Sequence, residues 1–124
     1  MQEINVIKAV LMKQANTIVA YHGSSVPIKR FDRSFSAQGV FWFCEDKNKI
    51  LSGDSGAISV DYIMRVSLTV HKTAGWDEYE KYMLAQLWND GYDSIKLDDN
   101  WVIFDSKNIK VLEAEQVKQD ELKL

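Results

Sequence analysis

The feature that most constrains this fold is an alternation of apolar and polar residues along positions 58–71. The apolar series, at every second position, comprises Tyr62, Met64, Val66, Leu68 and Val70. Because successive side chains of a β-strand point to opposite faces, this alternation predicts one long strand with a buried face. Strands rather than helices therefore dominate the architecture that we expect.

Other elements are predicted on both sides of this strand. Runs of apolar or β-forming residues predict strands over residues 17–21, 40–44, 92–97, 101–104 and 109–112. Helical spacing of apolar residues predicts helices over residues 1–16, from Glu45 to Leu51, and from Thr73 or Gly75 to Gly91. Since strands and helices do not alternate regularly, the expected class is α+β.

The segments between these elements are polar. Residues 23–38 form a long loop, which Val26, Ile28 and Phe31 are expected to fix to the core. Residues 98–100 form an acidic turn between two short strands. The charged tail, residues 113–124, is expected to fray.

Length and composition predict a single domain, residues 1–124, and exclude several classes of protein. The net charge is −3 and no cluster of lysine and arginine is visible, so we expect no nucleic-acid partner. Cys44 is the only cysteine, and His22 and His71 lack the spacing of metal ligands, so we assign neither a disulfide nor a metal. No membrane-spanning run or signal peptide is visible, which predicts a cytoplasmic protein with no membrane contact.

Three segments are candidates for the walls of one pocket. The first is Tyr-His-Gly-Ser at residues 21–24, where a strand ends in a loop. The imidazole of His22 can hydrogen-bond a polar ligand, and Gly23 lets a ligand approach the backbone. Residues 39–46 and 98–105 supply the other walls. The structural alternative is that His22 bonds nearby backbone and that residues 98–100 only form a turn.

In this order the segments resemble the ADP-ribosyltransferase superfamily. They are most similar to its His-Tyr-Glu branch, which contains the diphtheria-toxin-like enzymes and the poly(ADP-ribose) polymerases, and within it to small transferase domains of phage polyvalent proteins. The resemblance runs from about Tyr21 to Leu112. It implies a fold of split antiparallel β-sheets with flanking helices.

The first two motifs carry the expected NAD contacts. The family's His-Gly-(Thr/Ser) is matched by residues 22–24, which implies that His22 holds the nicotinamide-side ribose and that the backbone of Gly23 meets the carboxamide. The family's Gly-Ile/Val-Tyr-Phe-Thr/Ala-Asp is matched by Gly-Val-Phe-Trp-Phe-Cys-Glu-Asp at residues 39–46. Trp42, or Phe41 under the other alignment, then takes the place of the tyrosine that stacks on nicotinamide. The remaining contacts are expected from Tyr21 and Ser24.

The third motif departs from the family at its catalytic position. Asn-Trp-Val-Ile-Phe-Asp at residues 100–105 matches the family's Glu-Tyr-Ile/Val-Val-Phe/Tyr-Asp, so Asn100 stands where the family has glutamate. Residues 91–95 also resemble the family's Gly-(Tyr/Phe)-Asp-Gly-Ile. Asn100 can hydrogen-bond a ribose hydroxyl but has no charge, and losing one such group costs on the order of 3 kcal/mol, about a hundredfold in rate. Asp98 or Asp99 of the adjacent turn is the candidate source of the missing charge.

The resemblance implies a mono-ADP-ribosyltransferase, of phage or bacterial origin, that transfers ADP-ribose from NAD to a protein target such as a host protein. The expected catalytic residues are His22, Asn100 and Asp99. NAD is the substrate and no metal is needed. The alternative is a catalytically impaired module on the same fold that binds NAD, ADP-ribose or a partner. A structural interaction domain is less favoured. An RNA 2′-phosphotransferase is also less favoured, because Arg30, Arg33 and Arg65 form no evident phosphate site.

Overall fold

The computed structural model describes residues 15–32, 39–52 and 60–117. Residues 1–14 of the predicted N-terminal helix therefore lie outside the described residues, and Asn16, its last predicted residue, instead begins a strand. The elements are β1 (Asn16–Ser24), β2 (Phe41–Cys44), α2 (Lys47–Ser52), β3 (Tyr62–Val70), β4 (Thr73–Ala74), α3 (Trp76–Lys81), α4 (Leu84–Asn89), β5 (Ser94–Leu97), β6 (Asn100–Ile103), the 3-10 turn η2 (Ser106–Asn108) and β7 (Ile109–Gln116).

The strands form one seven-stranded sheet in the order β4-β5-β6-β2-β1-β3-β7. All neighbouring strands are antiparallel except β4 and β5, which run parallel. The α+β class is therefore confirmed, and the alternation at residues 62–70 does form the long strand β3. No helix within the three described ranges is long and apolar enough to cross a membrane.

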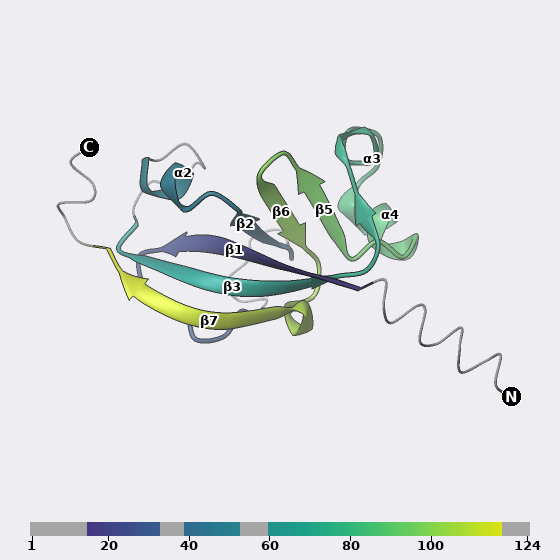
Figure 1. Cartoon of the computed structure of the whole chain (residues 1–124). Coiled ribbons are helices and arrows are strands. Elements are labelled where there is room, and N and C mark those ends of the chain that lie inside the picture. The colour runs from purple at the N-terminus through teal and green to yellow at the C-terminus, as the bar shows by residue number, and fades with distance from the viewer. Residues whose placement is uncertain (1–14, 33–38, 53–59, 118–124) are drawn as a thin grey trace, which may run out of the picture.

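The sheet consists of two parts that are joined at one point. β1 pairs with β3 along its full length, from Asn16 with Val70 to Ser24 with Tyr62. In contrast, the only paired residues of β1 and β2 are Tyr21 and Cys44. Figure 1 shows that the strands β1, β3 and β7 run at a marked angle to β5 and β6. We call the contact between Tyr21 and Cys44 the join.

The two faces of the sheet are covered differently. On one, which we call the loop face, Ile28 and Phe31 of the segment after β1 are buried against the core residues Ala20, Phe41, Phe43, Met64, Val66, Leu68, Trp101 and Ile103. On the other, the helix face, Leu87 of α4 packs on Ile95 and Val102. Ile50 of α2 packs there on Cys44. The expectation that Val26 also fixes the loop is wrong, because its side chain is 51% exposed.

Two other expectations are corrected. The helix predicted up to Gly91 is two short helices, because Tyr82 and Met83 have extended backbone and the Met83 N–H donates to Gln86 Oε1 at 3.1 Å. The charged tail does not fray at residue 113, because β7 continues to Gln116 along β3, whereas residues 118–124 lie outside the described residues. The side chains of Arg65 and Glu113 form an ion pair of 3.5 Å across these strands.

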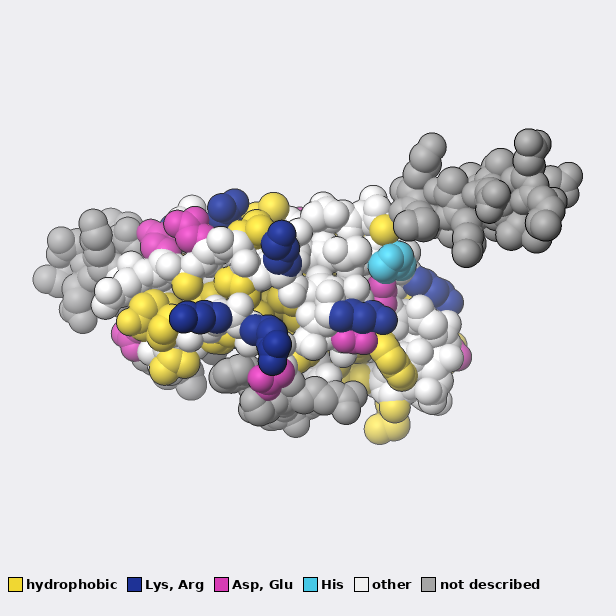
Figure 2. All heavy atoms as spheres, turned by 90° about the horizontal axis from the view of Figure 1, so that it is seen from below, with side chains coloured by type: hydrophobic (Ala, Val, Ile, Leu, Met, Phe, Trp, Pro, Cys, Tyr) yellow, Lys and Arg dark blue, Asp and Glu magenta, His cyan; other side chains and the backbone are white. Residues whose placement is uncertain are grey.

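Charged side chains are mixed on the face seen in Figure 2. Lysine and arginine side chains are scattered there, and several lie beside acidic ones. Such pairing also occurs between elements, since Lys47 of α2 bonds Glu115 of β7 at 2.9 Å. Among the described residues, this face therefore presents no continuous basic surface.

Candidate functional site

The three sequence motifs meet at the join. β1 carries the His-Gly-Ser motif, β2 the aromatic run and β6 the residue at the glutamate position. These strands are neighbours in the sheet, and Cys44 is paired with both Tyr21 and Asn100. Segments far apart in the sequence therefore come together where the two parts of the sheet diverge.

The side chain of His22 bridges the two strands next to the join. Its Nδ1 lies 2.8 Å from the carbonyl oxygen of Trp42. The ring also packs edge-on against Phe31, at a centroid distance of 5.0 Å, and against Phe43 at 5.6 Å. The imidazole is thus held in one orientation by a hydrogen bond and two aromatic rings.

Burial keeps this imidazole neutral at pH 7. Desolvation lowers the pKa of His22 below its usual value of 6.5, and the bond to the Trp42 carbonyl offsets this only in part. A carbonyl can only accept, so Nδ1 carries the proton and Nε2 is left as an acceptor. No described residue hydrogen-bonds Nε2. The site therefore presents a fixed acceptor that suits a hydroxyl group.

Asn100 does not lie on the same face as His22. Tyr21, Cys44 and Asn100 are opposite one another across three strands, so their side chains share the helix face. His22 follows Tyr21 directly, and its side chain packs with Phe31 and Phe43 on the loop face. The structure brings these residues to one region of the sheet, but their side chains point to opposite sides of it.

The two candidate aromatic residues are also separated. Because side chains alternate along β2, Trp42 faces away from Phe41 and Phe43. It lies on the helix face, is 38% exposed, and contacts Tyr79 of α3 at a centroid distance of 6.4 Å. Phe41 shares the loop face with His22 and is buried beside Phe31. Of the two candidates, only Phe41 therefore lies on the side of His22.

Packing, rather than ligand approach, explains the glycine at position 23. A Cβ atom on Gly23 would lie 2.8 Å from Cγ2 of Ile50 and 3.0 Å from Cγ2 of Val60. The hydroxyl of Ser24 accepts a hydrogen bond from the backbone N–H of Val26 at 3.2 Å. Gly23 and Ser24 therefore both have structural roles at the end of β1.

The carboxylate of Asp99 is occupied by Lys49 of α2. The two side chains form a short ion pair, and the hydrogen bond from Lys49 is the main reason that the pKa of Asp99 is lowered. The same bond raises the pKa of Lys49. The Glu45 N–H also donates to the Asp99 carbonyl at 2.8 Å. Asp99 therefore ties the β5–β6 turn to the segment after β2, and Lys49 counters its charge.

Sequence reasoning missed two residues of this region. Lys49 gave no signal, because its partner lies 50 residues away. The sequence predicts Trp101 only as part of a strand. In the structure its indole Nε1 is buried without a hydrogen-bond partner among the described residues. Trp101 is paired with Phe43 and therefore lies on the loop face, as His22 does. Buried unpaired donors are rare, so this N–H marks the region as unusual.

His71 is exposed and makes a structural contact. Its Nδ1 lies 2.8 Å from Oδ2 of Asp93. The same carboxylate accepts the backbone N–H groups of His71 and Lys72 and the hydroxyl of Ser94. Asp93 therefore fixes the turn between β3 and β4 to β5. Within the described residues, no group of acidic, histidine or cysteine side chains could hold a metal ion.

Comparisons with known proteins give no further identification. The sequence matches no protein-family model and no curated protein.

Proposed function

We propose that this protein is a mono-ADP-ribosyltransferase that binds NAD at the join and transfers ADP-ribose to a protein. The observation that carries the proposal is the meeting of β1, β2 and β6, with their three motifs, at the point where the sheet divides. Three motifs that resemble one family need not lie on neighbouring strands. Their convergence is the arrangement that a shared ligand site requires.

The state of His22 suits the ribose that it would contact. A ribose hydroxyl donates a hydrogen bond, and the neutral ring offers Nε2 as the acceptor. The bond from Nδ1 to the Trp42 carbonyl holds the ring in this tautomer and orientation. Such preorganisation lowers the entropic cost of ligand binding.

The expected reaction is slow. Breaking the nicotinamide–ribose bond develops positive charge on the ribose, which a carboxylate would stabilise. Asn100 supplies a hydrogen bond without that charge. Asp99, the nearest alternative in sequence, is paired with Lys49. Because Asn100 is neutral and the carboxylate of Asp99 is paired, we expect slow transfer. If the protein is of phage origin, the transfer takes place in the cytoplasm of a bacterial host.

A second function is favoured by one specific observation. The side chains of His22 and Asn100 point to opposite faces of the sheet, so a ligand held by His22 would not reach Asn100 without a rearrangement. A module that binds NAD or ADP-ribose without turnover needs only the His22 side. On this alternative the protein acts through binding, for example as an inhibitor.

Release of nicotinamide from NAD separates the two functions. The purified protein is incubated with NAD, alone and with bacterial lysate, and nicotinamide is quantified by chromatography. For the transferase we expect slow release that is lost in His22→Ala and increased in Asn100→Glu, since glutamate restores the missing charge. Binding of NAD without release supports the second function. If NAD neither binds nor is cleaved, both are wrong.

A further inference from the structure

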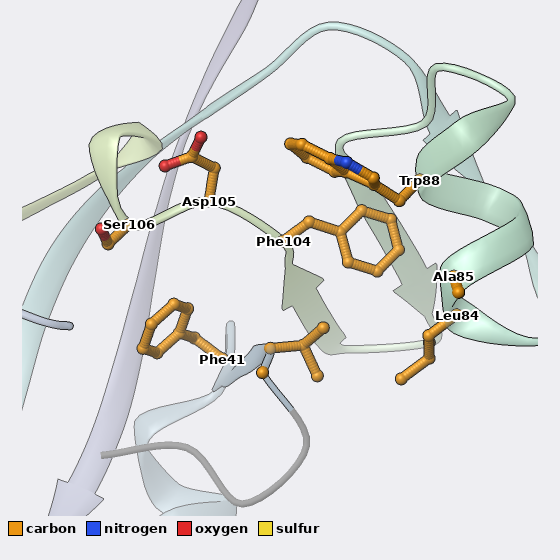
Figure 3. A pocket seen from close by; sticks show the side chains of 9 residues that line it. Phe41, Leu84, Ala85, Trp88, Phe104, Asp105 and Ser106 are labelled. Carbon is orange, nitrogen blue, oxygen red and sulfur yellow. The ribbon is translucent and has the colours of Figure 1, made fainter. Parts of the chain in front are cut away.

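A hollow separate from the join opens at the other end of β2 and β6 (Figure 3). It has a volume of about 490 Å³ and lies between Gly39, α4 and the segment that follows β6. Its walls are mostly apolar and consist of Val40, Phe41, Leu84, Ala85, Trp88 and Phe104. This volume is within the range of ligand pockets, about 300–1,000 Å³.

Aromatic rings stand on two sides of the hollow. The indole of Trp88 is 50% exposed and packs edge-on against Phe104 at a centroid distance of 6.1 Å. Figure 3 shows Phe41 across the hollow from these rings, and the carboxylate of Asp105 on the same side as the indole. Trp88 and Asp105 also line an adjacent hollow of about 390 Å³. They therefore stand at the centre of a wider surface depression.

The charge of the hollow is negative. Asp105 is the only ionisable side chain among the described residues that line it. Its Oδ1 accepts the backbone N–H of Lys107 at 3.0 Å, and its Oδ2 forms a long ion pair of 3.8 Å with the exposed Nζ of Lys107. This ion pair partly counters the charge of Asp105 but is too long to be a hydrogen bond. Oδ2 can therefore accept hydrogen bonds from a ligand. Aromatic faces also attract cations, so rings and carboxylate favour the same kind of group.

We propose that this hollow binds an arginine side chain of a protein partner, together with an apolar residue next to it. A guanidinium is planar, stacks on an indole and donates paired hydrogen bonds to a carboxylate, which the compact ammonium of lysine does less well. The indole of Trp88 and Oδ2 of Asp105 provide these contacts. The apolar neighbour packs on Leu84 and Ala85 of α4, which also line the hollow. The site lies apart from the join and does not depend on the proposed function.

The test uses two blocked dipeptides of nearly equal shape, acetyl-leucyl-arginine amide and acetyl-leucyl-citrulline amide. Citrulline keeps the planar end group but has no charge. Each is titrated into ¹⁵N-labelled protein, and the Trp88 indole N–H signal, assigned with Trp88→Ala, is followed by NMR. We expect this signal to move with the arginine peptide, which binds about tenfold more tightly than the citrulline peptide.

The variant Asp105→Asn tests the role of the charge. Asparagine retains an oxygen for the Lys107 N–H, so the fold is kept, but the preference for arginine should disappear. Trp76→Ala is the control, because this exposed tryptophan lies outside the hollow. The proposal is overturned by equal binding of both peptides, by an unchanged Trp88 signal up to the solubility limit, or by a preference that persists in Asp105→Asn.

Discussion

Replacing His22 by asparagine should make the stability of the protein less sensitive to acid. The side-chain amide of asparagine can still donate to the Trp42 carbonyl, as Nδ1 of histidine does at 2.8 Å, but it does not titrate. In the folded protein burial lowers the pKa of His22, whereas in the unfolded chain it returns to about 6.5. Between these two pKa values only the unfolded state takes up the proton.

The size of this effect follows from linkage. Above the unfolded pKa, His22 is neutral in both states and contributes no pH dependence. Below it, the unfolding free energy falls by up to about 1.4 kcal/mol per pH unit for one proton. At pH 5.5 the titration of His22 therefore lowers the free energy of unfolding by up to about 1.4 kcal/mol. The pKa of Asp99 is also lowered, but from 3.8, so that its contribution is lost at lower pH.

Urea denaturation at pH 7.5 and pH 5.5, followed by tryptophan fluorescence, measures the effect. The wild type and His22→Asn share every other ionisable group, so the difference between their losses of stability isolates His22. We expect the wild type to lose more stability on acidification, by up to about 1.4 kcal/mol. Equal losses would refute the conclusion that His22 is held neutral by burial.

Two further predictions concern the framework of the site. Asp93→Ala should destabilise the protein by about 2–3 kcal/mol, because several donors lose their common acceptor. The control Asp90→Ala should change stability by less than about 0.5 kcal/mol. Thermal denaturation measures the stability of both variants, and equal effects of the two substitutions would contradict the prediction. Gly23→Ala should cost about 1–3 kcal/mol through contact with Ile50, whereas Gly75→Ala meets only the Glu78 carboxylate at 3.8 Å and should be nearly neutral. Similar midpoints for the two alanine variants would show that the end of β1 can relax.

Local patterns were sufficient to predict the strands. The alternation of apolar and polar residues around Val66 gives a buried face only if the segment is a strand. Because side chains alternate between the two faces of a strand, Trp42 also points away from its buried neighbours in β2. The break between α3 and α4 was not predictable in this way. The helical spacing of apolar residues continues through Tyr82 and Met83. The interruption depends on a hydrogen bond from the backbone N–H of Met83 to the side chain of Gln86.

The site was predicted as a group of segments but not as a geometry. The sequence indicated that the strands of His22 and Asn100 belong together, and they lie on either side of β2. The register between β1, β2 and β6 decides which face each side chain takes, and it pairs segments that lie far apart in the sequence. The Lys49–Asp99 pair has the same origin, because α2 and the β5–β6 turn meet only in the folded protein.

Calorimetric titration of NAD into the protein tests the central claim most directly. We expect saturable binding of NAD to the wild type. The affinity for NAD should be at least about tenfold lower in His22→Ala and unchanged in Asp105→Asn, since Asp105 lines the separate hollow. His22→Asn should also weaken binding, because asparagine has no counterpart of Nε2. Absence of NAD binding to the wild type, or equal binding to His22→Ala, would contradict an NAD site at the join.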